Sequence, residues 1–190
     1  MNEKFPYGLF AVRHCLTQNN AECRITGQKD RIILSRSTDV SGMDKHIVDQ
    51  RGLLILTSPT CRCVETARLI ERHFSGSITF RTDDRLMERG MGIWEGMLKA
   101  DVLDNSSFRL SEGHLNPERT PPGGEPLEAC IQRIDQFIAD LMLLPSDQPI
   151  LISGHNQTLK LLKYRLYGLS NLLEYWVSAS FSNGKVTRIF

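Results

Sequence analysis

A chain of 190 residues with 41% hydrophobic and 24% charged residues has the composition of a globular protein and is long enough to bury its own core. Its 23 basic and 22 acidic residues leave a net charge of +1, which gives no sign of a nucleic-acid or membrane-surface partner. No apolar stretch reaches the ~18 residues of a membrane span, and the first residues lack the apolar core of a secretory signal. We therefore expect one cytoplasmic domain.

The cysteines argue against a metal site or a disulfide framework. Their number is odd, and the closest pair is separated by one residue rather than the two that are usual in zinc and redox motifs. We expect free, mostly buried thiols at positions 15, 23, 61, 63 and 130.

The first half of the chain contains two short apolar runs typical of buried strands, at 9–12 and 53–56. The polar stretch 17–29 between them is predicted to be a loop, and residues 37–50 form a weak helix candidate. After the second run, Ser58 suits a helix N-cap and Pro59 suits the first helical position, so a helix is expected to begin there.

The second half repeats this alternation. Strands are expected at 77–80 and 149–153. Helices are expected at 97–103, 127–141 and 158–167, and the segment 127–141 has the clearest amphipathic pattern. The irregular stretch 105–125 has the length of a lid or binding loop. At the end of the chain, residues 175–181 and 185–190 alternate around Asn183-Gly184, which predicts a hairpin. Its edge could serve a homodimer, and the sequence leaves the oligomeric state open.

Strands that alternate with helices indicate a single α/β domain with a mainly parallel sheet. In such a sheet, ligands bind beyond the carboxyl ends of the strands. Arg13-His14 and His155 follow two of the predicted strands, Arg62 lies in the first turn of the helix after a third, and Glu88 lies in a nearby loop. We expect these side chains to converge on one pocket.

These residue types are suited to phosphoryl transfer. Two guanidiniums and a second imidazole can hold the non-bridging oxygens of a phosphoryl group. A neutral His14, favoured by the neighbouring arginines, would attack the phosphorus and form a phosphohistidine. Glu88 would protonate the leaving alcohol and then accept a proton from water. No metal or other cofactor is required, because the arginines supply the positive charge.

The order of short motifs resembles the histidine phosphatase superfamily, in its phosphoglycerate mutase-like branch. The matching blocks extend over roughly residues 8–165, and together they are specific although each alone is weak. They are Arg13-His14 with Thr17, Asn20, Arg24 and Thr26-Gly27; Ser58-Pro59 with Arg62 and Thr66-Ala67; Leu86, Glu88, Gly92 and Trp94-Glu95-Gly96; Pro122 to Glu125; and His155.

This resemblance implies a three-layer α/β/α sandwich with a small cap segment at about 97–125. It implies that His14 and Glu88 are catalytic, and that the phosphate is bound by Arg13, Asn20, Arg62 and His155. Further candidates for contact with a small phosphomonoester substrate are Thr26, Gly27, Arg89, Arg109 and His114.

The chain departs from the family pattern at three positions. Cys15 replaces a glycine and is expected to narrow the phosphate pocket, Leu16 replaces a polar residue, and Asn156 replaces a second glycine. Only 36 positions separate Glu88 from Gly124, where the mutases of this family carry a large insertion, and this favours a phosphatase. Mutase-type phosphoryl transfer and a catalytically weakened phospho-ligand binding module stay open as alternatives.

Overall fold

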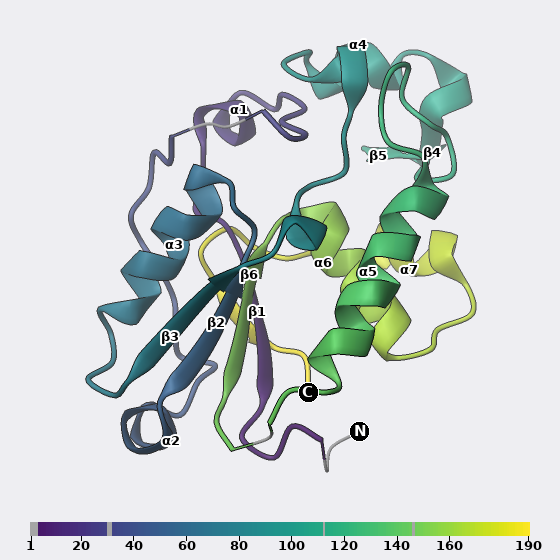
Figure 1. Ribbon diagram of the computed structural model, residues 1–190. Helices are drawn as coiled ribbons and strands as arrows, with labels where there is room; N and C mark the ends of the chain where they lie inside the picture. The colour runs from purple at the N-terminus through teal and green to yellow at the C-terminus, as the bar shows by residue number, and fades with distance from the viewer. Residues whose placement is uncertain (1–3, 30–31, 112, 146) are drawn as a thin grey trace.

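A five-stranded sheet lies between two layers of helices in the computed structural model, which describes residues 4–29, 32–111, 113–145 and 147–190 (Figure 1). The strand order is β3-β2-β6-β1-β7. The first four of these strands run parallel to one another, and the last pairs antiparallel with β1. Their bounds are β1 Leu9–Arg13, β2 Leu53–Thr57, β3 Ile78–Thr82, β6 Ile150–Gly154 and β7 Val186–Arg188.

Alternate side chains of each central strand point to opposite faces of the sheet, and each face has its own core. Leu9 and Ala11 pack with α5 (Leu127–Leu141) and α6 (Asn156–Leu166). Phe10 and Val12 lie in the second core, on the face covered by α2 (Lys45–Arg51) and α3 (Cys61–Glu71). Because helices cover both faces, the central strands β1, β2 and β6 are mostly apolar and buried, as is typical of such sheets, whereas the edge strand β3 is more polar and exposed. The expected three-layer sandwich is confirmed.

The predicted strands at 9–12, 53–56 and 149–153 and the helix at 127–141 are confirmed, with small changes at their ends. The predicted loop at 17–29 instead contains a short helix, α1 (Gln18–Ala21), because Thr17 and Asn20 form a reciprocal capping box. The helix expected from Ser58 begins later: Thr60 is the N-cap of α3, and the Ser58 hydroxyl lies near His155 instead.

The predicted terminal hairpin is wrong. Residues 175–178 of its first half belong to α7 (Leu172–Ser178), which begins where the Asn171 side chain accepts a hydrogen bond from the Glu174 N–H. Only the second half forms a strand, and β7 pairs with β1. Apolar residues in this segment alternate over too few positions to distinguish a strand from a short helix, and the side-chain cap favours the helix.

The segment after the Trp94-Glu95-Gly96 motif lies above the carboxyl ends of the strands (Figure 1). It contains α4 (Lys99–Leu103), a 3-10 turn Ser106–Phe108 and a small ribbon of β4 (Arg109–Ser111) and β5 (His114–Leu115). Two further 3-10 turns, Asp84–Leu86 and Gly92–Trp94, precede it. We call residues 97–125 the cap.

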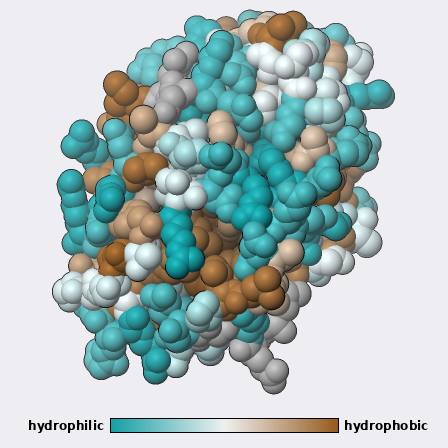
Figure 2. Space-filling model, viewed as in Figure 1, coloured by the Kyte–Doolittle hydropathy of each residue, from teal (hydrophilic) through white to brown (hydrophobic). Residues whose placement is uncertain are grey.

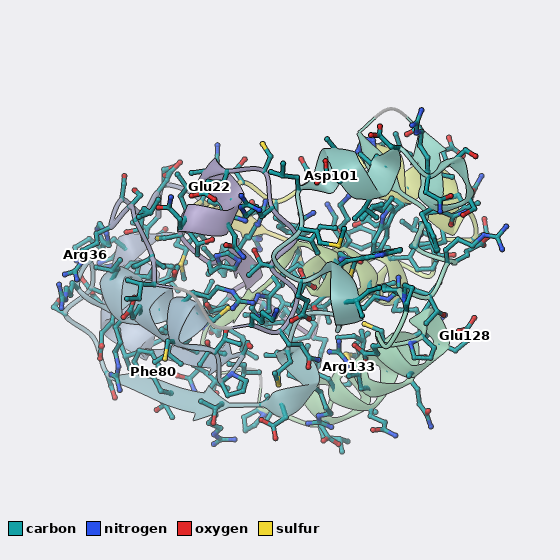
Figure 3. All side chains as sticks on the ribbon, turned by 90° about the horizontal axis from the view of Figure 1, so that it is seen from above. Glu22, Arg36, Phe80, Asp101, Glu128 and Arg133 are labelled. Carbon is teal, nitrogen blue, oxygen red and sulfur yellow. The ribbon has the colours of Figure 1, made fainter. Side chains whose placement is uncertain are left out.

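The cap is joined to the loop that follows β1. Backbone hydrogen bonds run from Ile25 N to Met97 O (2.9 Å) and from Lys99 N to Cys23 O (2.9 Å). Figure 3 shows Glu22 of this loop and Asp101 of α4 along the same side of the molecule. A small third core, which includes Ile25, Trp94 and Val102, fills the space beneath.

Most of the surface seen in Figure 2 is hydrophilic, with apolar side chains gathered in the lower central part of that view. Among the described residues, no helix has the length and apolarity needed to cross a membrane.

Candidate active site

A cavity of about 350 Å³ opens at the carboxyl ends of β1 and β6, beneath the cap. It is lined by all the residues predicted to be catalytic or phosphate-binding, together with Thr26 and Gly27. These residues come from separate parts of the chain and meet because parallel strands end at one edge of the sheet. They are Arg13, His14, Asn20, Arg62, Glu88 and His155.

His14 lies just after β1 and is 3% exposed. Its Nδ1 lies 2.8 Å from the carbonyl oxygen of Cys15. A carbonyl oxygen only accepts, so Nδ1 carries the proton and donates it in this bond. In the neutral imidazole, Nε2 therefore keeps its lone pair. Asn183 Nδ2 donates to the main-chain carbonyl of His14 at 2.8 Å and so holds the backbone at this position.

His155 follows β6 and is fully buried. Burial, and then the positive charges of Arg62, His14 and Arg13, lower its pKa well below the ordinary value. The ring is therefore neutral at pH 7. Arg62 Nη2 donates to its Nδ1 at 3.1 Å, so the proton is on Nε2, which lies 3.0 Å from Ser58 Oγ. The ring centroids of His14 and His155 are 5.3 Å apart.

The two arginines are held differently. Arg62 donates to the carbonyl oxygens of Lys29 (2.7 Å) and Gly27 (2.8 Å). Arg13 has one long bond, from Nη1 to Phe181 O at 3.4 Å, and its buried Nε has no hydrogen-bond partner among the described residues. Burial, and then the charge of Arg62, lower the pKa of Arg13, while Glu88 opposes the shift. An anion in the cavity would supply the missing partner for Arg13.

Glu88 lies at the N-terminus of α6. Its Oε1 accepts from the Thr158 N–H (3.2 Å) and hydroxyl (3.1 Å), and its Oε2 lies 3.3 Å from the Gln157 nitrogen. Free N–H groups and the helix dipole stabilise a carboxylate in this position.

Three other candidates are placed as follows. The buried Arg89 guanidinium donates to Glu125 O (2.9 Å) and Pro117 O (2.6 Å), so it ties the end of the cap to the Glu88 segment and does not line the cavity. Arg109 donates to Leu103 O within the cap. His114 lines a neighbouring cavity instead. Neither Arg89 nor Arg109 is among the residues that line the catalytic cavity.

The three departures from the family pattern have different surroundings. Cys15 is buried, its N–H donates to Thr66 Oγ1 at 2.8 Å, and its side chain is not part of the cavity wall. The expectation that it narrows the phosphate pocket is therefore wrong. Leu16 and Asn156 both line the cavity, and Asn156 Oδ1 accepts from the Phe181 N–H at 3.2 Å.

The cavity also contains residues that the sequence did not single out. Lys99 adds a positive charge from the first turn of α4, and Asn183 contributes an amide from the other end of the chain. Asn183 was recognised only as a turn residue, and nothing in the sequence connects it to His14. Within the parts of the chain that the structure describes, no group of three or more His, Cys, Asp or Glu residues is arranged to hold a metal.

The sequence model of the histidine phosphatase superfamily (branch 1) matches residues 9–189. The chain belongs to this superfamily. It is 31% identical over 138 residues to a probable fructose-2,6-bisphosphatase TIGAR A of Danio rerio, a match that covers 70% of this chain and 52% of that protein. It is 28% identical to a probable phosphoglycerate mutase GpmB of Salmonella paratyphi B, over 85% of this chain and 75% of the relative.

Solved structures share the fold of this superfamily member. A mycobacterial glucosyl-3-phosphoglycerate phosphatase in complex with VO3 superposes with a TM-score of 0.77 and 24% identity, over 95% of this chain and 90% of that one. A putative alpha-ribazole-5'-P phosphatase from Escherichia coli gives a TM-score of 0.69 at 23% identity, over 95% and 93%.

Proposed function

We propose that this histidine phosphatase superfamily member is a phosphomonoesterase that hydrolyses a small phosphorylated metabolite through a phosphohistidine on His14. The hydrogen bond from His14 Nδ1 to the Cys15 carbonyl carries the proposal, because it leaves Nε2 with its lone pair inside a cavity rich in cationic and N–H donors. This is the arrangement that nucleophilic catalysis at a phosphoryl group requires.

In the first step, His14 Nε2 forms a bond to phosphorus as the bond from phosphorus to the leaving oxygen breaks. Arg13 and Arg62 bind the non-bridging oxygens, whose charge they stabilise through the transition state. Glu88 gives its proton to the leaving oxygen.

In the second step, water attacks the phosphorus, Glu88 takes the proton of that water, and the bond to Nε2 breaks. Inorganic phosphate leaves and the enzyme returns to its starting state. The neutral His155 accepts from Arg62 at Nδ1 and has its only ring proton on Nε2, beside Ser58 Oγ, so it orients the Arg62 guanidinium rather than acting as a second base.

The names of the relatives support two outcomes for the phosphoenzyme, transfer to water or transfer back to a substrate. The short separation between Glu88 and Gly124 favours water as the acceptor. We also propose that the protein is cytoplasmic and that its substrate is a small molecule.

The test is release of phosphate from p-nitrophenyl phosphate in the presence of EDTA. We expect turnover by the wild type, a loss of about 10³-fold or more in His14→Ala, and a loss of about 10²-fold in Glu88→Gln. Absence of turnover on a broad panel of phosphomonoesters would favour the binding module. Isomerisation of phosphoglycerate well above hydrolysis, with bisphosphoglycerate present, would favour the mutase.

A further inference from the structure

A second cavity of about 350 Å³ adjoins the catalytic one, between the cap, α6 and α7. Lys99, Leu115, Asn156 and Gln157 line both cavities, so the two adjoin at these residues. The proposed reaction steps do not use the second cavity. A substrate whose phosphoryl group lies against His14 can extend its alcohol part in this direction.

The second cavity carries positive charge without a counter-charge. Its described lining contains Lys99 and Lys160 and no aspartate or glutamate. Neither lysine forms an ion pair among the described residues. An ammonium buried without a counter-charge is unfavourable, so this site is suited to an anion.

Lys160 is the more buried of the two lysines, with 4% of its surface exposed. Its Nζ donates to the Trp176 carbonyl oxygen at 2.6 Å and lies 5.1 Å from the centroid of the Trp176 ring. Both partners are neutral, and an ammonium has three N–H donors. The carbonyl bond explains how Lys160 anchors α7, but it leaves donor capacity that an anion could use.

The positive charges of Lys99, Lys160 and Arg13 repel one another, and this lowers the pKa of both lysines. Burial, and then the positive charges of Lys99 and Arg13, lower the pKa of Lys160 to about 8, while Glu88 opposes the shift. Burial and the charge of Arg13 also lower the pKa of Lys99. Arg13, Lys99 and Lys160 thus form a continuous band of positive charge from the catalytic cavity into the second one. Lys160 is still mostly protonated at pH 7, because its pKa lies above that value.

We propose that the second cavity binds a second anionic group, a carboxylate or a phosphate, on the alcohol part of the phosphomonoester, with Lys160 as the residue that selects for it. The inference rests on the proposed function, since it assumes that the phosphoryl group occupies the cavity of His14. It narrows the substrate class to metabolites with two anionic groups.

The test compares matched pairs of ligands by calorimetry at pH 7, with the His14→Ala variant so that binding is measured without turnover. One pair is 3-phosphoglycerate and glycerol 3-phosphate, which differ in a carboxylate. The other is fructose 1,6-bisphosphate and fructose 6-phosphate, which differ in a phosphate. In at least one pair, we expect the doubly anionic ligand to bind about 10-fold more tightly than its singly anionic partner. The pair that shows this difference identifies the second anionic group as a carboxylate or a phosphate.

Adding Lys160→Met should reduce this ratio to about 3-fold or less, and Lys160→Arg should largely preserve it. Lys163→Met is the matched control, because it removes the same charge from the same helix outside the cavity. If Lys160 only anchors α7, its loss will weaken both ligands equally and the ratio will not change. Should Lys160→Met not fold, Ser180→Asp places a negative charge in the cavity wall and should selectively weaken the doubly anionic ligand.

A ratio near one for both pairs, or a ratio that Lys160→Met leaves unchanged, would overturn the inference. Hydrolysis of p-nitrophenyl phosphate by the wild type is scored separately. Hydrolysis with a flat binding ratio refutes the second anion site and leaves the phosphatase proposal standing. Tighter binding of the doubly anionic ligand without hydrolysis of p-nitrophenyl phosphate refutes the phosphatase proposal and leaves the second anion site standing.

Discussion

His14 and His155 are both imidazoles at strand ends, yet their surroundings give them opposite hydrogen-bonding patterns. His14 donates from Nδ1 to a carbonyl oxygen and keeps Nε2 as a base. His155 accepts at Nδ1 from Arg62 and keeps its proton on Nε2. A nucleophile and a donor are thus obtained from the same residue type by different neighbours. The sequence predicted that both residues belong to one pocket, but it could not show which nitrogen of either ring carries the proton.

The thiols also differ by environment. Burial raises the pKa of Cys63 and of Cys130 to about 12, and it also raises the pKa of Cys15. Thiolates are the reactive form, so these three thiols should be inert in the folded protein. Cys23 and Cys61 are exposed.

Brief treatment with N-ethylmaleimide at pH 7 should therefore label Cys23 and Cys61, whereas labelling after denaturation should reach all five cysteines. Peptide mass spectrometry measures the labelled positions. Rapid labelling of Cys15 in the native protein would contradict its buried position next to His14.

At the scale of elements, the long and strongly patterned segments could be predicted from the sequence. The apolar runs of β1, β2 and β6 and the amphipathic helix α5 are examples, because burial on one or both faces dictates their pattern. Shorter elements depend on contacts that a local pattern does not contain. Helix α7 depends on the Asn171 cap, and Asn183 reaches His14 only because β7 pairs with β1.

The loop at 27–29 supports the phosphate site through Glu95. Glu95 Oε1 accepts from the N–H groups of Gln28 (2.9 Å) and Met91 (3.0 Å). The carboxylate lies so close to Gly27 that an added Cβ would meet Oε1 at 2.1 Å, and Gly27 has a φ of +55°. The same loop supplies the carbonyls that hold Arg62. Glu95 is therefore a positioning residue for Arg62.

Replacing Glu95 by alanine should raise the inhibition constant of inorganic phosphate by about 10-fold, because two N–H groups lose their acceptor and the loop loosens. Glu95→Gln keeps an oxygen acceptor and should lie much closer to the wild type. Competitive inhibition of p-nitrophenyl phosphate hydrolysis measures the constant. Equal effects of the two substitutions, or none from alanine, would count against this role.

The stability of the whole molecule depends on pH through His155, a residue of the candidate site. The folded protein holds this ring neutral, because burial and nearby cations lower its pKa well below the ordinary value of 6.5. In the unfolded chain the ring takes up a proton at about pH 6.5. Between these two pKa values the unfolded state binds more protons, so the free energy of unfolding falls as the pH decreases below about 6.5 and is not affected by this group above it.

Denaturant unfolding at pH 7, 6 and 5 should therefore show decreasing stability, with His155 contributing up to about 1.4 kcal/mol per pH unit. His155→Gln should flatten this dependence even if it lowers stability at pH 7. His46→Gln, at an exposed position in α2, is the control and should keep the wild-type slope. An unchanged slope in His155→Gln would show that other groups cause the acid sensitivity.

The central claim is that His14 carries the phosphoryl group, and direct detection of that bond tests it. Glu88→Gln is mixed with p-nitrophenyl phosphate, whose leaving group needs little protonation, so the phosphoenzyme should accumulate while its attack by water is slow. After a quench in base, peptide mass spectrometry should find phosphate on His14, lost on mild acid treatment and absent from the His14→Ala, Glu88→Gln double variant. Turnover of the substrate by the wild type with no phosphate on His14, or with phosphate on another residue, would contradict the account.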